Sequence, residues 1–250
     1  VRAPGEIAAT ARNQIVQVVD GGVLAELFIE EGEQVAQGQM LAVLEKERAR
    51  ASFEEGRAKV AALRIALVRA RAEARQETLV FSDADLAYPS FVAAQMELYK
   101  QKKAALEESL ALLRTNFDLA RRQLEINEGL YESRDVSLLD VMSSQARVSD
   151  ARNKVLEAEN KYLLDAFEES AKLESDLAMA AQQTKEKRDV FSHTEVRAPV
   201  AGIVKHLNVN TLGGVMRSGD QLMEISPTES ELIVEVRISP ADIGQLELGL

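Results

Sequence analysis

The feature that most constrains this 250-residue chain is a long central stretch of helix-type hydrophobic periodicity. From Phe53 to Leu177 apolar residues recur at intervals of three and four, and turn signals interrupt the pattern at residues 82–89 and 132–136. Such steps, sustained over five heptads in the middle segment, are typical of a coiled-coil seam rather than of an ordinary amphipathic helix. We therefore predict three helices, near residues 48–81, 90–131 and 137–192.

The start of the third helix has a local cause. Ser137 is followed three residues later by Asp140, which is close to a capping box. The hydroxyl can accept an orphan backbone N–H, and the helix dipole favours the carboxylate. Beyond this start, large residues recur every seven positions and are expected to form the seam with the neighbouring helix: Val141, Val148, Val155 and Tyr162.

Two β-rich segments, residues 15–46 and 194–227, flank the helices and resemble each other. Each contains three short apolar runs separated by glycine turns. Each is too small to bury its own apolar face, so we expect the two to pack as one β-sandwich that is split in the sequence. The fold class is α+β. Matched positions lie 180 residues apart, and 181 after one extra residue in the second copy: Gly22/Gly202, Leu27/Leu207, Ile29/Val209, Val35/Val215, then Gly38/Gly219 and Leu41/Leu222.

The helix lengths predict how the helices are arranged. At 1.5 Å per residue they span roughly 50, 60 and 85 Å, so the third can return from the tip in one pass only if the first two overlap. An extended link over residues 82–89 can retreat by about 25 Å. The charges agree with an arrangement in which the first helix lies beside the third. Residues 46–75 hold nine basic and four acidic side chains, whereas residues 157–176 hold seven acidic and two basic. We predict an antiparallel hairpin about 85 Å long with a staggered three-helix section near its base.

Composition excludes several classes of protein. With 41 acidic against 30 basic residues and a net charge of −11, the chain lacks the basic balance of a nucleic-acid-binding protein. It has no cysteine, hence no disulfide, thiolate nucleophile or cysteine-bound zinc. No apolar run approaches the ~20 residues of a membrane span, and no signal peptide opens the chain. We expect a soluble fragment of a longer protein.

Sites for catalysis are also missing from the sequence. His193 and His206 lie thirteen residues apart, which fits no usual zinc spacing, and both are expected at a surface or interface. No phosphate loop, nucleotide fingerprint or nucleophile elbow is present. The carboxylates are expected on helix surfaces, without a pocket to shift their pKa values. We predict that the chain is not an enzyme and that it holds no cofactor and no metal.

Each β segment resembles half of a lipoyl or biotinyl domain, so the sandwich is expected to be lipoyl-like. Aligning residues 41–49 with the lipoyl consensus places Arg48 in the slot of the modified lysine, and Lys46 lies two positions away. About 150 residues of coiled coil also replace the tight hairpin that a modifying ligase would need. Both observations disfavour a carrier function.

A lipoyl-like fold split by a long α-hairpin resembles the periplasmic adaptors, or membrane fusion proteins, and most closely the HlyD branch that serves type I secretion. The Gly213-Gly214-Val215 turn favours the secretion branch over the drug-efflux branch. Residues 232–238 and 242–244 resemble the entry to the family's next β-domain. The segments that carry the resemblance are residues 2–7, 18–26, 31–35, 38–39, 196–202, 213–215 and 222–223.

The resemblance implies the domains and the function. Residues 1–14 would begin a membrane-proximal β-domain, residues 15–46 and 194–227 would be the lipoyl-like halves, residues 47–193 the hairpin, and residues 228–250 the truncated start of a β-barrel domain. The protein would be the periplasmic part of a single-pass inner-membrane protein of a Gram-negative bacterium. Its partners would be an inner-membrane ABC transporter, a TolC-like outer-membrane channel, the secreted protein, and further copies of itself as a trimer or hexamer.

In many such adaptors the hairpin tip docks the channel through an Arg-x3-Leu-x6-Ser pattern. Leu130 and Ser137 fit this spacing here, but the arginine slot holds Ile126, and Arg134 or Arg122 is the candidate substitute. Ser137 also has a structural role as N-cap, beside Asp140. The expected partner-binding residues are therefore Leu130, Ser137, Ile126, Arg134 and Asp140.

Three alternatives stay open. The chain could be a drug-efflux adaptor that serves a different transporter, a lipoylated or biotinylated carrier, or a plain structural coiled-coil spacer. Segments 137–141 and 160–164 also resemble the helices of TolC-type channels, but such a channel would lack the two β halves.

Overall fold

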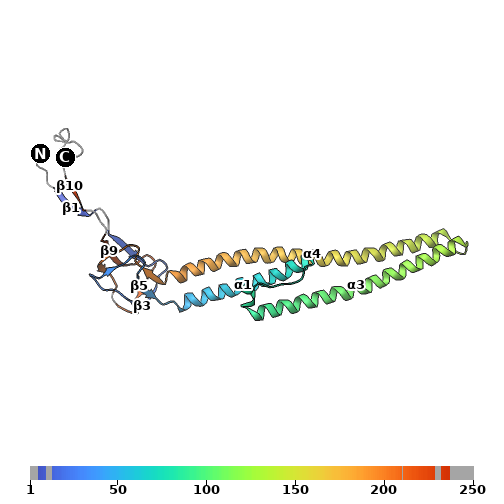
Figure 1. Ribbon diagram of the computed structural model, residues 1–250, viewed down its shortest axis with the longest axis horizontal. Coiled ribbons are helices and arrows are strands. Elements are labelled where there is room, and N and C mark those ends of the chain that lie inside the picture. The colour runs from blue at the N-terminus through green and yellow to red at the C-terminus, as the bar shows by residue number, and fades with distance from the viewer. Residues whose placement is uncertain (1–4, 10–12, 210, 229–231, 237–250) are drawn as a thin grey trace, which may run out of the picture. The chain divides into compact units, whose positions relative to one another are not determined.

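The computed structural model describes residues 5–9, 13–209, 211–228 and 232–236 (Figure 1). The chain divides into two compact units, residues 1–54 with 185–250, and residues 55–184. The strands all lie in the first unit: β1 (Gly5–Ala9), β2 (Gln14–Gln17), β3 (Gly22–Leu27), β4 (Gln34–Val35), β5 (Met40–Leu44), β6 (Glu195–Arg197), β7 (Gly202–Leu207), β8 (Val215–Met216), β9 (Gln221–Pro227) and β10 (Leu232–Val236).

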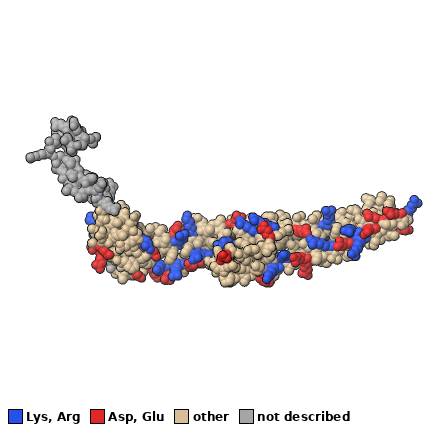
Figure 2. Space-filling model, in the orientation of Figure 1, with Lys and Arg blue, Asp and Glu red and all other residues tan. Residues whose placement is uncertain are grey.

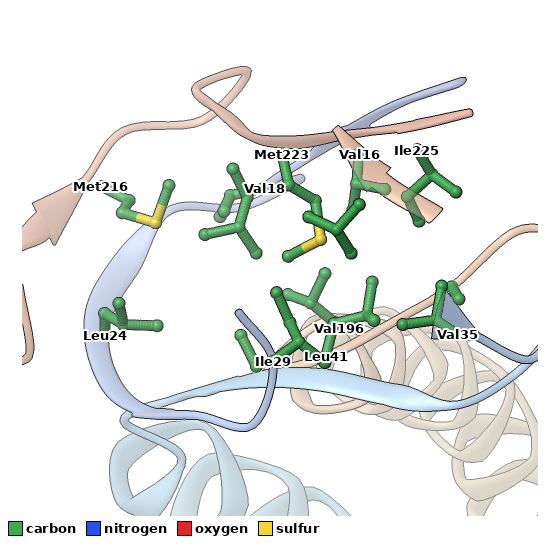
Figure 3. Close-up of a cluster of buried hydrophobic side chains, with 14 of the residues drawn as sticks. Val16, Val18, Leu24, Ile29, Val35, Leu41, Val196, Met216, Met223 and Ile225 are labelled. Atoms are coloured by element: carbon green, nitrogen blue, oxygen red, sulfur yellow. The ribbon is translucent and has the colours of Figure 1, made fainter. Parts of the chain in front are cut away.

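The two β-rich segments fold together into one sandwich, as predicted. One sheet has the order β2-β9-β7-β4 and the other β6-β5-β3-β8, so each sheet takes two strands from each end of the chain. All pairs are antiparallel. Side chains from both ends meet in the core between the sheets, where Leu24, Leu41 and Met223 are fully buried (Figure 3). Neither end could bury these residues alone, and the α+β fold class is confirmed.

The second half of the repeat contains one extra residue, and it lies earlier in the chain than the sequence alignment placed it. Val35 pairs with Gly202, and Met216 pairs with Gly22, so the structural equivalent of Val35 is Met216 rather than Val215. Burial agrees, because Val35 and Met216 are buried whereas Val215 is exposed. The extra residue of the second half therefore lies before β8.

Gly202 is a glycine for a steric reason. A Cβ atom at this position would lie 2.3 Å from the backbone oxygen of Ser226 and 2.7 Å from the Ile225 side chain. The residue sits on β7 between its two neighbouring strands, where it pairs with Val35 on β4 and with Pro227 on β9. Any side chain here would push β7 and β9 apart.

Four helices separate the two β segments in the sequence: α1 (Glu47–Arg75), α2 (Asp83–Leu86), α3 (Pro89–Glu132) and α4 (Leu138–Ser192). The first helix ends at Arg75, so the prediction that it reaches residue 81 was wrong. Gln76 adopts a left-handed φ of 56°, and the N–H groups of Gln76 and Glu77 donate to the carbonyls of Glu73 and Ala72. This is a Schellman ending. The break in the apolar pattern at Glu77 marks the end of the helix.

The link between the first and second long helices is not simply extended. It contains α2, where the backbone N–H and hydroxyl of Ser82 both donate to the Asp85 carboxylate, at 3.1 and 2.6 Å. Arg64 on α1 bonds Asp85 at 2.7 Å and the carbonyl of Ala84 at 3.1 Å. Burial opposes ionisation of Asp85, but the hydrogen bonds from Ser82 and Arg64 outweigh it and lower its pKa. The link is thereby fixed to α1.

The last turns of α1 lie against α4 and the first turns of α3, and we call this the three-helix section (Figure 1). Arg69 of α1 bonds Gln95 of α3 at 2.7 Å and also Glu169 of α4. Arg71 pairs with Glu174 of α4 at 3.0 Å. These pairs confirm the predicted register of the basic stretch of α1 against the acidic stretch of α4. Farther along, α3 and α4 continue as the two arms of the hairpin, with charges of both signs interspersed over them (Figure 2).

The outer ends of the chain fall largely outside the described residues. β1 and β10 pair antiparallel from Gly5/Val236 to Ala9/Leu232, and they form a separate two-stranded sheet. The expected domains at residues 1–14 and 228–250 stay predictions, and residues 237–238 and 242–244, which carried part of that resemblance, are not described. None of the helices in the described part of the chain combines the length and apolar character needed to span a bilayer.

Candidate functional site: the hairpin tip

The turn at the hairpin tip is closed by backbone hydrogen bonds at the end of α3. The N–H groups of Arg134 and Asp135 donate to the carbonyls of Tyr131 and Leu130, both at 2.9 Å. Arg134 has a left-handed φ of 62°, so this is a second Schellman ending, with arginine in the position that glycine usually takes. Arg134 thus has a backbone role in the turn.

The start of α4 is capped as the sequence predicted. The Ser137 N–H and hydroxyl both donate to Oδ2 of Asp140, at 3.0 and 2.6 Å, and the Asp140 N–H donates back to the Ser137 hydroxyl at 3.3 Å. The hydrogen bonds from Ser137 lower the pKa of Asp140. Both side chains are exposed, yet the hydroxyl of Ser137 is already engaged.

A polar contact joins the two helices just below the turn. Asn127 on α3 donates to the hydroxyl of Ser144 on α4 at 2.6 Å, and Ser144 donates to the carbonyl of Asp140 at 3.0 Å. Ser144 is only 2% exposed. Asn127, which interrupts the apolar seam in the sequence, therefore fixes the register of the two helices at the tip.

Apolar side chains around this fixed turn face solvent. Ile126 is 57% exposed and Leu130 is 38% exposed, and the two lie one helical turn apart on α3. A rigid turn that presents exposed apolar side chains is suited to docking on another protein. The exposed apolar residues, which we call the tip cluster, also include four that sequence analysis did not select: Tyr131, Leu138, Leu139 and Met142.

The five predicted partner-binding residues are thus all near one turn, but their local roles differ. Ile126 and Leu130 are exposed apolar residues, whereas Arg134, Ser137 and Asp140 shape the turn and the cap. Arg122 lies on α3 one turn before Ile126 and is exposed. Binding by any of them stays a prediction. The apolar side chains at residues 138, 139 and 142 were present in the sequence but were not among the predicted partner-binding residues.

The described residues contain no cluster of three or more His, Asp or Glu side chains that could hold a metal. His193 pairs with Asp20 at 2.6 Å, and His206 with Glu31 at 3.1 Å. The expectation that the carboxylates lie on helix surfaces was wrong for Glu73 and Asp85, which are each 2% exposed.

The pKa values of Glu169, Asp85 and Asp140 are all lowered, which favours the charged form of each carboxyl group. Burial would raise the pKa of Glu169, but hydrogen bonds and charge from Arg69 and Lys102 lower it. Asp85 and Asp140 are also lowered, by the contacts described above. A lowered pKa makes a carboxylate a weaker base and leaves it ionised at neutral pH, which suits structural pairing rather than proton transfer.

Similar proteins cover almost the whole chain. The leukotoxin export protein LtxD of Aggregatibacter actinomycetemcomitans is 23% identical, over 99% of this chain and 62% of its own length. The chromosomal hemolysin secretion protein D of Escherichia coli is 22% identical, over 99% and 62%. The type I secretion system membrane fusion protein PrsE of Rhizobium meliloti is 24% identical, over 94% and 64%. The predicted resemblance to the HlyD-type membrane fusion proteins is confirmed. No protein-family model matches the chain.

Solved structures of adaptors share the fold of this HlyD-like chain. The soluble domain of LipC, a membrane fusion protein of a type I secretion system, matches with a TM-score of 0.52 at 20% identity, covering 87% of this chain and all of that one. The periplasmic adaptor protein EmrA matches with a TM-score of 0.50 at 17% identity, covering 99% and 81%. The chain spans about 62% of the length of LtxD and hemolysin secretion protein D.

Proposed function

We propose that this chain is the periplasmic part of an adaptor for type I protein secretion. In this proposal an inner-membrane ABC exporter binds its membrane-proximal parts, and a TolC-like outer-membrane channel binds the hairpin tip. The protein acts as a homo-oligomer, a trimer or a hexamer, and the secreted protein passes along the assembly. The names of the similar proteins support this function, since they are export or secretion proteins.

One observation about the tip carries the docking role. Exposed apolar side chains surround a turn that is closed by a Schellman ending on one side and a capping box on the other. A hairpin with so little core per residue gains nothing from placing Leu130, Leu138 and Leu139 in water. A partner surface at the tip would remove them from solvent.

Cross-linking in cells tests this docking. Leu130→Cys in the full-length protein should cross-link to the outer-membrane channel during secretion. The matched control is Asp118→Cys, an exposed position twelve residues earlier, about 18 Å down the same helix. The control should give little or no product. Continued secretion with no cross-link at Leu130 would overturn docking by the tip.

The main rival is a drug-efflux adaptor, which would share the same fold. A gene deletion separates the two, because loss of a secreted protein without a change in drug sensitivity is expected only for the secretion adaptor. A lipoyl or biotinyl carrier is disfavoured further, because Arg48, in the lysine slot, lies in the first turn of α1 rather than in a tight β-hairpin. A plain spacer would tolerate substitutions at the tip without loss of export.

A further inference from the structure

Within the described residues the β-sandwich has four edge strands, β2 and β4 in one sheet and β6 and β8 in the other. Three of them are protected against pairing with another chain. β4 and β8 have only two residues each. β6 has three, its Glu195 and Arg197 form an ion pair at 2.8 Å, and Pro199 follows shortly after. Short strands, charged side chains and proline are the features that keep other strands from adding to a sheet.

The fourth edge, formed by β2 and the two residues after it, is built differently. Residues 14–19, which we call the β2 edge, contain no charged side chain and no proline. Val16 and Val18 are buried in the core between the sheets (Figure 3). Ile15 and Val19 are both 55% exposed. An uncharged edge with exposed β-branched side chains is a surface on which a further strand can pair.

The backbone of the β2 edge has donors and acceptors that point away from the sheet. Val18 directs its N–H and its C=O toward the residues just before β9, where they form hydrogen bonds of 2.9 and 2.8 Å. The irregularity between β2 and β9 is an extra residue on β9, so β2 itself keeps its alternation. The groups of Val16 therefore also point to β9, whereas those of Ile15 and Gln17 point outward. In the described part of the chain no hydrogen bond engages these outward groups.

A groove runs beside the β2 edge, between β2 and β6. Its volume is about 280 Å³, and its lining includes Ile15, Val19, Val196 and Pro199. An apolar groove therefore lies next to outward backbone donors and acceptors. This combination fits an extended peptide, because successive side chains of a strand point to opposite faces. The backbone of such a peptide can pair with β2 while every second side chain enters the groove.

We propose that the β2 edge binds an extended segment of unfolded polypeptide as an additional strand, and that this segment belongs to the secreted protein. The source of the segment rests on the proposed function, whereas the binding mode rests on the β2 edge itself. Ile15 and Gln17 together offer four outward backbone groups, one N–H and one C=O each. Four hydrogen bonds of ordinary net strength correspond to a dissociation constant of about 1 mM. Such weak binding does not hold a permanent subunit, but it suits a chain that has to be released as it moves on.

Photo-cross-linking of a synthetic peptide to the purified full-length protein tests the binding mode. The probe is a biotinylated peptide of alternating threonine and valine that carries a benzophenone group. It is used well below its dissociation constant, so that the yield of cross-linked product follows the affinity. Gln17→Pro removes one outward N–H and leaves the bonds to β9 in place, and the yield should fall about fivefold. A matched probe with proline at its centre should cross-link to the parent protein just as weakly.

A second variant keeps every backbone group and protects the edge with a charge. Ile15→Lys should also lower the yield several-fold, because a lysine on an edge strand opposes pairing with a further strand. The matched control is Ile203→Lys on β7 of the same sheet. Ile203 is 44% exposed, but it pairs with Gln34 on β4 and with Ser226 on β9, so its strand has no open edge. The control should keep the parent yield, and equal melting temperatures would show that both variants are folded.

The outcomes separate this inference from the function that it builds on. No cross-link to the parent protein, or equal yields from the parent and both edge variants, would overturn strand addition at β2 and leave the adaptor function standing. A disulfide-linked dimer of Gln17→Cys in cells would show that the edge pairs with a second copy, and would also overturn it. In cells Ile15→Lys should lower the amount of secreted protein several-fold relative to Ile203→Lys. Equal secretion by these two variants would overturn the secreted protein as the occupant.

Discussion

In the three-helix section α3 and α4 pack against α1 and bury charged side chains of that helix. Nearer the tip the same two helices leave apolar side chains exposed to solvent. Arg69 and Glu73 are 1% and 2% exposed, compared with 57% for Leu119. Arg69 bonds Glu73, Gln95 and Glu169, and Lys102 bonds Glu169 at 2.7 Å and Glu73 at 3.3 Å. Within the described residues, Oε1 of Glu73 is the buried side-chain atom that lacks a hydrogen-bond partner.

This difference follows from the number of helices. Two helices can bury only a narrow seam, whereas a third helix encloses the side chains between them. Buried ion pairs contribute little net stability, because desolvation offsets their attraction, but a broken pair leaves a costly uncompensated charge. The three-helix section therefore disfavours any other register of its helices, while the two-helix part leaves apolar side chains exposed to solvent.

The largest expected effect comes from breaking the buried network. Arg69→Met leaves the charge of Glu73 buried without its main partner, and we expect a loss of about 3–5 kcal/mol in the free energy of unfolding. Denaturant unfolding followed by far-ultraviolet circular dichroism measures this loss. The control is the double variant Arg69→Met with Glu73→Met, which removes both charges and should recover most of the stability. A double variant that is no more stable than the single one would contradict the explanation.

The second prediction compares two Ser-x-x-Asp caps, a buried one at α2 and an exposed one at the tip. Asp85→Asn weakens the bonds from Ser82 and Arg64, and we expect a loss of about 1–2 kcal/mol at neutral pH. Because the native pKa of Asp85 is lowered, this stabilisation is complete above the unfolded value of 3.8 and disappears as the pH falls through the native value. The variant and the parent protein should therefore converge in acid.

Asp140→Asn is the matched variant at the tip. The pKa of Asp140 is also lowered, so its contribution is likewise lost as the pH falls through its native value. The loss at neutral pH should be smaller than for Asp85→Asn, because Asp140 is exposed and has no arginine partner in the described structure. Unfolding curves at neutral pH and at about pH 2 measure both variants. A loss of equal size at the two caps would contradict the role given to burial.

The third prediction contrasts two sides of α3 within the two-helix part. Leu124 is 9% exposed in the seam, and Leu124→Ala should cost about 2–3 kcal/mol. Leu119 is 57% exposed on the solvent side of α3, and Leu119→Gln should change the unfolding free energy by no more than about 0.5 kcal/mol. The same unfolding measurement serves for both. A large loss from Leu119→Gln would contradict this contrast, because it would show that the exposed side chain stabilises the single chain as the seam does.

The sequence was sufficient to predict the features that depend on the spacing of residues along the chain. The heptads of α3 and α4, the glycine turns of the two β halves and the Ser137–Asp140 cap all follow from local pattern. The end of α1 was missed because apolar residues continue beyond it, and Leu79 is buried in the link rather than on a helix. The repeat was misplaced at Val215 because its neighbour Met216 is also apolar, and only the pairing with Gly22 distinguishes them.

Features that depend on distant parts of the chain could not be predicted. Arg69 and Glu73 look like ordinary surface charges in the sequence, and they become buried only because Glu169 lies a hundred residues away on a third helix. At the tip, Leu139 and Met142 fit a helix-interior pattern equally well. Their exposure depends on which side of α4 faces α3, and that is set by Asn127 and Ser144 across the turn.

The smallest predicted effect compares the two Schellman endings, one in each part of the hairpin. Gln76 and Arg134 both hold a left-handed φ, of 56° and 62°, which costs a residue with a Cβ atom up to about 1 kcal/mol more than glycine. Gln76→Gly and Arg134→Gly should each relieve this strain, but glycine also gains freedom in the unfolded chain. We therefore expect a net gain of only a few tenths of a kcal/mol from each, measured by denaturant unfolding. If Arg134→Gly leaves stability intact but reduces cross-linking between Leu130→Cys and the channel, the arginine side chain binds the partner as well as shaping the turn.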